Sequence, residues 1–229
     1  MVDVLGQAFF DHYHQLKPSK LWIHNQYGPK EEMPVDVFFR DADDMPDLEL
    51  FAISECRGKV LDIGAGAGSH ALLLQDRGGD VTAIDISPLA VQVMQQRGVK
   101  KAFEADIYTY HPGKFDTLLL LMNGVGLAGD IDGLKTLLTH FRSLLNPGGQ
   151  ILFDSSDISY LYEGNLPANK YYGEIAYQYQ YKHLKTDWFK WLYIDEQTLT
   201  LIANEVGFDV NVLVEDEYDQ YLVRLTQSK

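Results

Sequence analysis

The chain has 229 residues, a hydrophobic content of 46% and a formal net charge of −14 at pH 7. This length and apolar content allow one sizeable hydrophobic core. The acidic balance, without any run of Lys or Arg, argues against a nucleic-acid partner, because a phosphate backbone would be repelled. The single cysteine, Cys56, excludes an internal disulfide framework, and no Cys/His spacing predicts a metal site.

The sequence shows no pattern typical of a membrane-spanning helix or a signal peptide. The sequence has no apolar run near the ~20 residues that a spanning helix needs. The N-terminus, MVDVLGQAFFDHYHQ, lacks the basic start and the small-residue cleavage site of a signal peptide. We therefore expect a cytoplasmic protein without a membrane partner, present as a monomer or a homodimer.

In chain order, the first expected element is a helix within residues 1–50, followed from residue 60 by alternating strands and helices. The N-terminal helix has an apolar stripe formed by Leu5, Ala8, Phe9, His12 and Leu16. The expected strands are 60–63, 81–85, 102–105, 115–122 and 150–154, and the expected helices are 69–77, 88–97 and 131–145. This β-α-β-α alternation predicts an α/β fold with a doubly wound, mostly parallel sheet and helices on both faces.

The last part of the chain has a different pattern. An aromatic-rich segment at about 156–195 contains two extended pieces, 175–181 and 187–194, that we expect to pair as a hairpin. A helix at 195–206 precedes alternating residues at 208–214 and 221–225, which predict an antiparallel hairpin at the sheet edge. We therefore expect a helical cover at 1–50 and a core at 51–229 with an insertion at about 156–195, both covering segments lying over the ligand face.

The stretch KVLDIGAGAGSHALLL predicts a strand, a glycine loop and a helix, which usually hold a nucleotide-like ligand. Gly64 and Gly66 let the backbone approach a ligand where a Cβ atom would collide. A dinucleotide fingerprint would have its third glycine where this chain has Ser69. Asp62 also precedes the loop, and a carboxylate there suits a ligand with a cationic amino group and no phosphate, such as S-adenosylmethionine.

The segment VLDIGAGAG resembles the first motif of the class I S-adenosylmethionine-dependent methyltransferases. Four further segments resemble later motifs of that family in the right order: VTAIDISPLAV, AFEADIYTY, FDTLLLLMNGVGL and LNPGGQILFD. The resemblance covers about residues 57–154. It implies a Rossmann-like sheet of seven strands with an antiparallel C-terminal hairpin, and S-adenosyl-L-methionine as the cofactor.

The same resemblance implies a set of cofactor-binding residues. Asp85 would accept hydrogen bonds from both ribose hydroxyls, and Asp106 would accept one from the adenine amino group unless it is an ordinary turn aspartate. Asp62 either lies near the methionine end or orders the loop, and Asn123 either contacts a ligand or supports a turn. The full expected set is Asp62, Gly64, Ala65, Gly66, Gly68, Asp85, Ile86, Asp106, Ile107 and Asn123.

The function predicted from these motifs is in-line methyl transfer to a small-molecule acceptor. No residue is an evident catalytic base, and the weak candidates are His14, Asp154 and His183. A nicotinamide-dependent oxidoreductase is an alternative, although Ser69 and Asp62 count against it. A non-catalytic cofactor-binding module is a second alternative, which the intact glycine loop and Asp85 disfavour.

Overall fold

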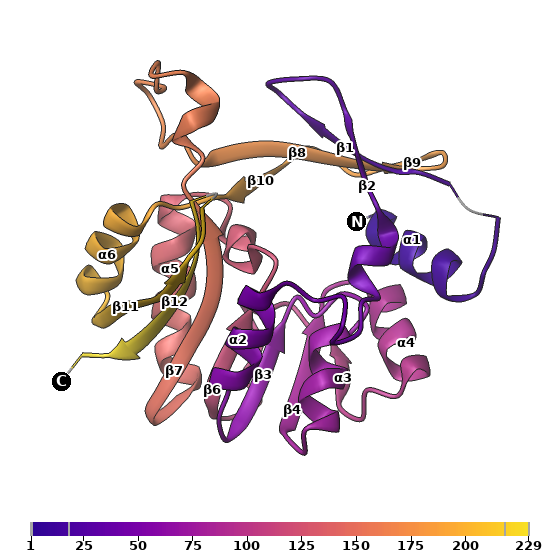
Figure 1. The fold of residues 1–229 in the computed structure, drawn as a ribbon, viewed down its shortest axis with the longest axis horizontal. Coiled ribbons are helices and arrows are strands. Elements are labelled where there is room, and N and C mark those ends of the chain that lie inside the picture. Colours follow the sequence, from indigo (N-terminus) through magenta and orange to yellow (C-terminus); the bar gives the residue numbers. More distant parts are fainter. Residues whose placement is uncertain (1, 18, 218, 229) are drawn as a thin grey trace. The chain divides into compact units, whose positions relative to one another are not determined.

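A computed structural model describes residues 2–17, 19–217 and 219–228, and the chain divides into two compact units (Figure 1). The first unit comprises Met1–Met45, Leu61–Tyr110 and Ala176–Phe189. The second unit comprises Pro46–Val60, His111–Ile175 and Lys190–Lys229. The division into a cover at 1–50 and a core at 51–229 stays a prediction.

The main sheet has seven strands in the order β11-β12-β7-β6-β3-β4-β5. Parallel pairing joins β4 to β5 and β6 to β7, whereas β12 is antiparallel to both β7 and β11. The predicted fold class, mostly parallel with an antiparallel C-terminal hairpin, is therefore confirmed. The strands are β3 (Lys59–Ile63), β4 (Asp80–Asp85), β5 (Ala102–Glu104), β6 (Phe115–Leu120), β7 (Leu145–Ser156), β11 (Phe208–Glu215) and β12 (Gln220–Gln227).

Helix α4 has the expected bounds, and α3 begins at the expected residue and ends one residue earlier than expected. Helix α4 is capped by Ser87, whose Oγ accepts from the Ala90 N–H, and it ends at Gly98 with φ 101°. Helix α1 lies against α4 (Figure 1). Its apolar stripe was expected to reach Leu16, but the helix ends at Tyr13, and Leu16 is 47% exposed. The helical elements of this unit are α1 (Val4–Tyr13), η1 (Val35–Phe38), α3 (Ser69–Asp76) and α4 (Pro88–Arg97).

A second, smaller sheet has the order β10-β8-β1-β2, with β9 also paired to β8. The hairpin expected within the aromatic-rich segment is confirmed by the pairing of β8 with β10. Two strands from the N-terminal region, which was expected to be only partly helical, extend this sheet. They join it because β1 pairs antiparallel with β8, with Ile23 opposite Tyr179. The strands are β1 (Leu21–Asn25), β2 (Glu31–Met33), β8 (Glu174–Tyr181), β9 (Leu184–Lys185) and β10 (Phe189–Leu192).

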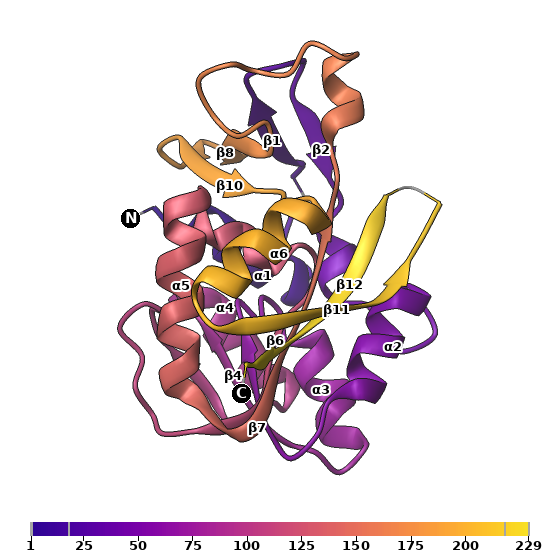
Figure 2. The ribbon, with the colours of Figure 1, turned by 90° about the vertical axis from the view of Figure 1, so that its left-hand side faces the viewer.

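The second unit contains three α-helices and two short 3-10 helices among the described residues. Helix α6 is capped by Asp195 and lies beside β11 (Figure 2). Within the described part of the chain, every helix is too short or too polar to cross a membrane. These elements are α2 (Asp47–Glu55), η2 (Gly124–Ala128), α5 (Ile131–Leu144), η3 (Ser159–Tyr162) and α6 (Glu196–Glu205).

The Pro147-Gly148-Gly149 turn lies inside β7 rather than before it. We expected the strand to start at residue 150, but it starts at Leu145, directly after α5. Phe115 is opposite Leu145 while Thr117 is opposite Gln150, so the turn residues are extra residues that bulge out of the pairing with β6.

A buried carboxylate joins α1 to the β8–β9 turn within the first unit. Asp11 is 3% exposed, and it accepts hydrogen bonds from Gln7 Nε2 at 2.9 Å, Tyr181 Oη at 3.1 Å and Lys182 Nζ. Burial alone would raise the pKa of Asp11, but the donors, Lys182 first, outweigh it and hold the pKa below the usual value.

We expect Asp11→Ala to lower the free energy of unfolding by about 2 kcal/mol at neutral pH, because Tyr181 and Lys182 lose their acceptor. A lowered carboxyl pKa stabilises the fold above the unfolded-state pKa of 3.8, and the benefit is lost as the pH falls through the folded-state pKa. Urea unfolding at several pH values measures this difference. Asp43→Ala, at an exposed position, is the control; equal effects of the two changes would contradict the prediction.

Candidate functional site

The glycine loop turns back over the carboxyl end of β4. Gly64, Gly66 and Gly68 have φ angles of 70°, 57° and 86°, a left-handed conformation that only glycine adopts readily. The N–H groups of Gly64 and Ala65 donate to the Ile84 carbonyl at 2.9 and 3.0 Å. The loop is therefore fixed at the point where ligands bind in parallel α/β sheets.

Asp85, the last residue of β4, connects this loop to the start of α4. Its Oδ2 accepts from the Gly66 N–H and its Oδ1 from the Ser87 N–H, both at 2.9 Å. Burial raises the pKa of Asp85 to about 6, although these two N–H donors oppose the rise. Each carboxylate oxygen keeps a further acceptor position. The next residue, Ile86, is 60% exposed, an unusual position for a large apolar side chain.

Asp62 is a buried carboxylate that is only partly satisfied. The side chain is 2% exposed, and its Oδ2 has no hydrogen-bond partner among the described residues. Burial raises the pKa of Asp62 to about 6; Asp85 adds to the rise, while His70 and the Ala71 N–H oppose it. A buried oxygen without a partner needs an explanation. A cationic group bound at the loop would supply one, so this site fits the ammonium of S-adenosylmethionine.

Two further expected residues follow β5. Asp106 is exposed, and its Oδ1 accepts from the Tyr108 N–H at 3.0 Å, which forms an Asx turn. Ile107 is 6% exposed. The structure thus places Asp106 and Ile107 in the same unit as the glycine loop and Asp85, whereas Asn123 belongs to the second unit.

Residues that the sequence did not single out as site residues enclose the glycine loop. A Cβ atom on Gly66 would lie 3.6 Å from the Phe9 ring and 3.7 Å from the Phe38 ring. Arg97 donates to the Ala67 carbonyl at 2.7 Å and to Ser69 Oγ at 3.2 Å. For Phe9, the apolar stripe of α1 was a signal in the sequence that this side chain is buried. Nothing in the local sequence indicates the contacts of Phe38 or Arg97.

In the second unit, Asn123 lies in a buried polar network after β6. Its N–H donates to Asp154 Oδ2 at 2.9 Å, its Nδ2 donates to the Leu192 carbonyl at 3.1 Å, and its Oδ1 accepts from Ser155 Oγ at 2.9 Å. Asn123 has φ 53° and Met122 has φ 60°, both uncommon for residues other than glycine. The Asn123 side chain thus uses its amide in holding the loop to the end of β10 and to β7.

The three weak base candidates have unlike surroundings. His14 is exposed and lies against Phe10, and His183 is exposed in the β8–β9 turn. Asp154 is 1% exposed, and its Oδ1 has no partner in the described part of the chain. Burial raises the pKa of Asp154 to about 6, against the hydrogen bonds from Asn123 and Gln220.

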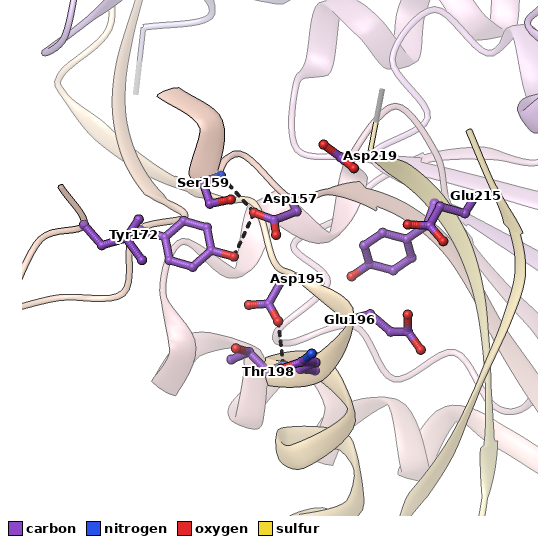
Figure 3. A pocket seen from close by; sticks show the side chains of 11 residues that line it. Asp157, Ser159, Tyr172, Asp195, Glu196, Thr198, Glu215 and Asp219 are labelled. Atoms are coloured by element: carbon purple, nitrogen blue, oxygen red, sulfur yellow. Dashed lines mark hydrogen bonds between the residues drawn. The ribbon is translucent and has the colours of Figure 1, made fainter. Parts of the chain in front are cut away.

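The second unit also contains a cavity of about 530 Å³ between η3, the start of α6 and the β11–β12 turn (Figure 3). Several of its acidic side chains have structural partners. Asp157 accepts from the Ser159 N–H at 2.8 Å and from Tyr172 Oη at 2.9 Å, and Asp195 accepts from the Thr198 N–H at 2.9 Å (Figure 3). No cluster in the described residues could hold a metal ion.

Comparison with known proteins decides the family. A family model described as a methyltransferase domain matches residues 39–212. The crystal structure of an S-adenosylmethionine-dependent methyltransferase from Bacteroides fragilis, in complex with S-adenosyl-L-homocysteine, is 41% identical. The alignment covers 99% of this chain and 95% of that chain, with a TM-score of 0.92. This chain belongs to the S-adenosylmethionine-dependent methyltransferases.

One more distant relative agrees with this assignment, and a further structure shares the fold. An uncharacterized methyltransferase from Staphylococcus carnosus (strain TM300) is 25% identical over 194 residues, which cover 83% of this chain and 87% of that protein. The sugar N-methyltransferase KedS8 from Streptoalloteichus sp ATCC 53650 shares the fold, with a TM-score of 0.62 at 16% identity over 89% of this chain and 96% of that chain. The family and the cofactor predicted from the motifs are confirmed, which removes the nicotinamide-dependent alternative.

We expect Asp62→Asn to stabilise the cofactor-free methyltransferase at about pH 8 by about 1–3 kcal/mol, because the buried charge is removed. The folded-state pKa of about 6 exceeds the unfolded value of 3.8. The free-energy cost of burying ionised Asp62 is therefore absent below pH 3.8 and is fully present above about pH 6. Thermal unfolding of both proteins from about pH 4 to pH 8 measures this. Asp76→Asn, at an exposed site on α3, should give no such pH-dependent gain; a gain that does not grow with pH would contradict the prediction.

Proposed function

We propose that the methyltransferase transfers a methyl group from S-adenosylmethionine to a small-molecule acceptor by in-line displacement. The observation that carries this proposal is the glycine loop together with two carboxylates: Asp62, one oxygen of which has no partner among the described residues, and Asp85, whose oxygens can each accept a further hydrogen bond. A phosphate-bearing ligand would meet two like charges there. A cofactor with a sulfonium, an ammonium and a free ribose meets acceptors that suit it.

Each expected residue except Asn123, whose amide holds its own loop, then has a role in holding the cofactor. Asp85 accepts from the ribose hydroxyls with the acceptor positions that Gly66 and Ser87 leave open. The backbone of 64–68 and the Asp62 carboxylate receive the methionine half. The adenine contacts fall to Ile86, Asp106 and Ile107, where exposed Ile86 offers an apolar surface for the ring.

Three features support a small, neutral or cationic acceptor. The net charge of −14 opposes binding of nucleic acid. The cavity in the second unit has a volume of about 530 Å³, within the range of small-molecule sites. Its lining includes Asp157, Asp195 and Glu215, which would repel an anion. We expect the enzyme to act in the cytoplasm as a monomer or a homodimer.

The chemistry of the step depends on positioning. S-adenosylmethionine supplies a methyl group that is already activated on a sulfonium. The chain then has to hold the acceptor lone pair in line and exclude water, which contributes up to roughly 7–11 kcal/mol in favourable cases. An oxygen or carbon acceptor also needs a base. Of the three candidates, only Asp154 is buried, where its pKa is raised to about 6 and one oxygen has no partner among the described residues.

Calorimetry with S-adenosylhomocysteine tests the cofactor site. We expect the wild-type protein to bind, and Asp85→Asn to bind about tenfold more weakly, because an amide replaces one acceptor oxygen with a donor. Asp80→Asn, at an exposed position on the same strand, removes the same charge and should bind like the wild type. Failure of the folded wild-type protein to bind at roughly millimolar ligand would overturn the proposal.

Incubation with S-adenosyl-L-[methyl-¹⁴C]methionine tests the acceptor class. A cell extract that retains its metabolites is separated into protein, nucleic-acid and small-molecule fractions after reaction with the enzyme. We expect the label in the small-molecule fraction, and Asp85→Asn enzyme gives the background. Label found mainly in protein or nucleic acid would contradict the small-molecule assignment while leaving the cofactor assignment intact.

A further inference from the structure

Asp3, just before α1, joins the starts of two helices. Its Oδ1 accepts from the Gly6 N–H at 2.9 Å and so caps α1. Its Oδ2 accepts from Ser87 Oγ at 2.8 Å and from the Leu89 N–H at 3.3 Å, at the first turn of α4. One carboxylate therefore satisfies N–H groups of both helices, which otherwise have no partner inside their own helix.

Ser87 continues this chain of contacts toward the cofactor loop. Its N–H donates to Asp85 Oδ1 at 2.9 Å, and the other oxygen of Asp85 accepts from the Gly66 N–H at 2.9 Å. The contacts thus run from Asp3 through Ser87 and Asp85 to Gly66. All four residues lie in the first unit.

Helix α1 packs so closely against Ser87 that there is no room for a side chain at Gly6. A Cβ atom on Gly6 would lie 2.1 Å from Ser87 Oγ and 2.4 Å from Asp3 Oδ1. Glycine in a helix interior costs about 1 kcal/mol relative to alanine, so its presence there has a packing reason. Further along α1, Phe9 packs over Gly66. Helix α1 is therefore fitted against Ser87 at Gly6 and against the glycine loop at Phe9.

We propose that Asp3 is a positioning residue for cofactor binding, which holds Ser87 so that Asp85 faces the ribose hydroxyls. The inference rests on the ribose contact proposed for Asp85. Asp3 lies outside residues 39–212, the part that the family model matches, so this role belongs to the N-terminal segment of the chain.

The charge of Asp3 also acts on Asp85. Burial is the largest cause of the raised pKa of Asp85, and the Asp3 carboxylate raises it further. Among the described residues, Asp62 on β3 also interacts with Asp85 through its charge, and Asp62 in turn interacts with His70 on α3. Removing the charge of Asp3 should therefore lower the pKa of Asp85, while Asp62 continues to oppose ionisation.

Two substitutions at Asp3 test the role of its hydrogen bonds and of its charge. Binding of S-adenosylhomocysteine is measured by calorimetry from about pH 5 to pH 8. Asp3→Ala removes the acceptor of Ser87, and we expect about tenfold weaker binding at the upper end of this range. Asp3→Asn removes the charge but keeps one acceptor oxygen, which can cap α1 or accept from Ser87 Oγ, since Asn is as good a helix cap as Asp. We expect a smaller loss of affinity at high pH than for Asp3→Ala, and a further loss that begins at lower pH than in the wild type.

Two matched variants serve as a second probe and a control. Gly6→Ala keeps the Asp3 carboxylate but forces α1 away from Ser87, so it should weaken binding as Asp3→Ala does. Asp130 is a comparable cap, because it accepts from the Gly133 N–H at 2.9 Å at the start of α5 in the second unit. Asp130→Ala loses helix stability in the same way and should bind S-adenosylhomocysteine like the wild type. Circular dichroism and thermal unfolding identify the variants that are folded at the assay temperature.

The outcomes separate this inference from the proposed function. If folded Asp3→Ala and Gly6→Ala bind like the wild type, Asp3 is only a helix cap and the inference fails. If Asp3→Ala weakens binding but Asp85→Asn does not, Asp3 does not act through Asp85 and the inference also fails. If the wild-type protein binds no S-adenosylhomocysteine, the proposed function itself fails.

Discussion

The proposed cofactor site depends on a single carboxylate that holds a glycine loop across the end of a neighbouring strand. Asp85 accepts from Gly66 on one side and from Ser87 on the other. Asp62 lies close enough to Asp85 for the two charges to interact, and burial raises both pKa values to about 6. At neutral pH this leaves Asp62 ionised where little water reaches it and close to a second carboxylate, which disfavours the folded state unless a bound cation offsets the charge.

In the second unit, by contrast, most buried polar groups near the loop after β6 bond to one another. Around Asn123 nearly all buried polar groups have partners: the side chain meets Ser155 and Leu192, and Ser155 Oγ also accepts from the Ile194 N–H at 3.0 Å. Satisfied buried networks are rigid, since breaking one bond leaves a desolvated group. The left-handed residues after β6 are held in place by this network. The loop is thus fixed by internal bonds, whereas the glycine loop keeps acceptors free for a ligand.

Much of the core could be read from the sequence because its signals are local. Ser87 and Gly98 mark the ends of α4, and the apolar run after Lys114 marks β6. The N-terminal region could not be read in this way. Nothing in the residues of β1 shows that their partner is β8, because pairing between distant segments has no periodicity of its own. The same holds for the site: the glycine loop and Asp85 are motif residues, whereas Phe38 and Asp3 reach the loop only through the tertiary fold.

The pairing of β1 with β8 has a consequence for biosynthesis. His24 and Gln180, which share a hydrogen bond, are separated by 156 positions in the chain. During synthesis the N-terminal strand leaves the ribosome long before its partner exists, so its open edge must wait unpaired. Contacts between such distant segments form slowly. The nascent chain therefore passes through a stage in which the core strands up to β7 can associate while residues 21–25 remain available to chaperones or to unintended strand partners.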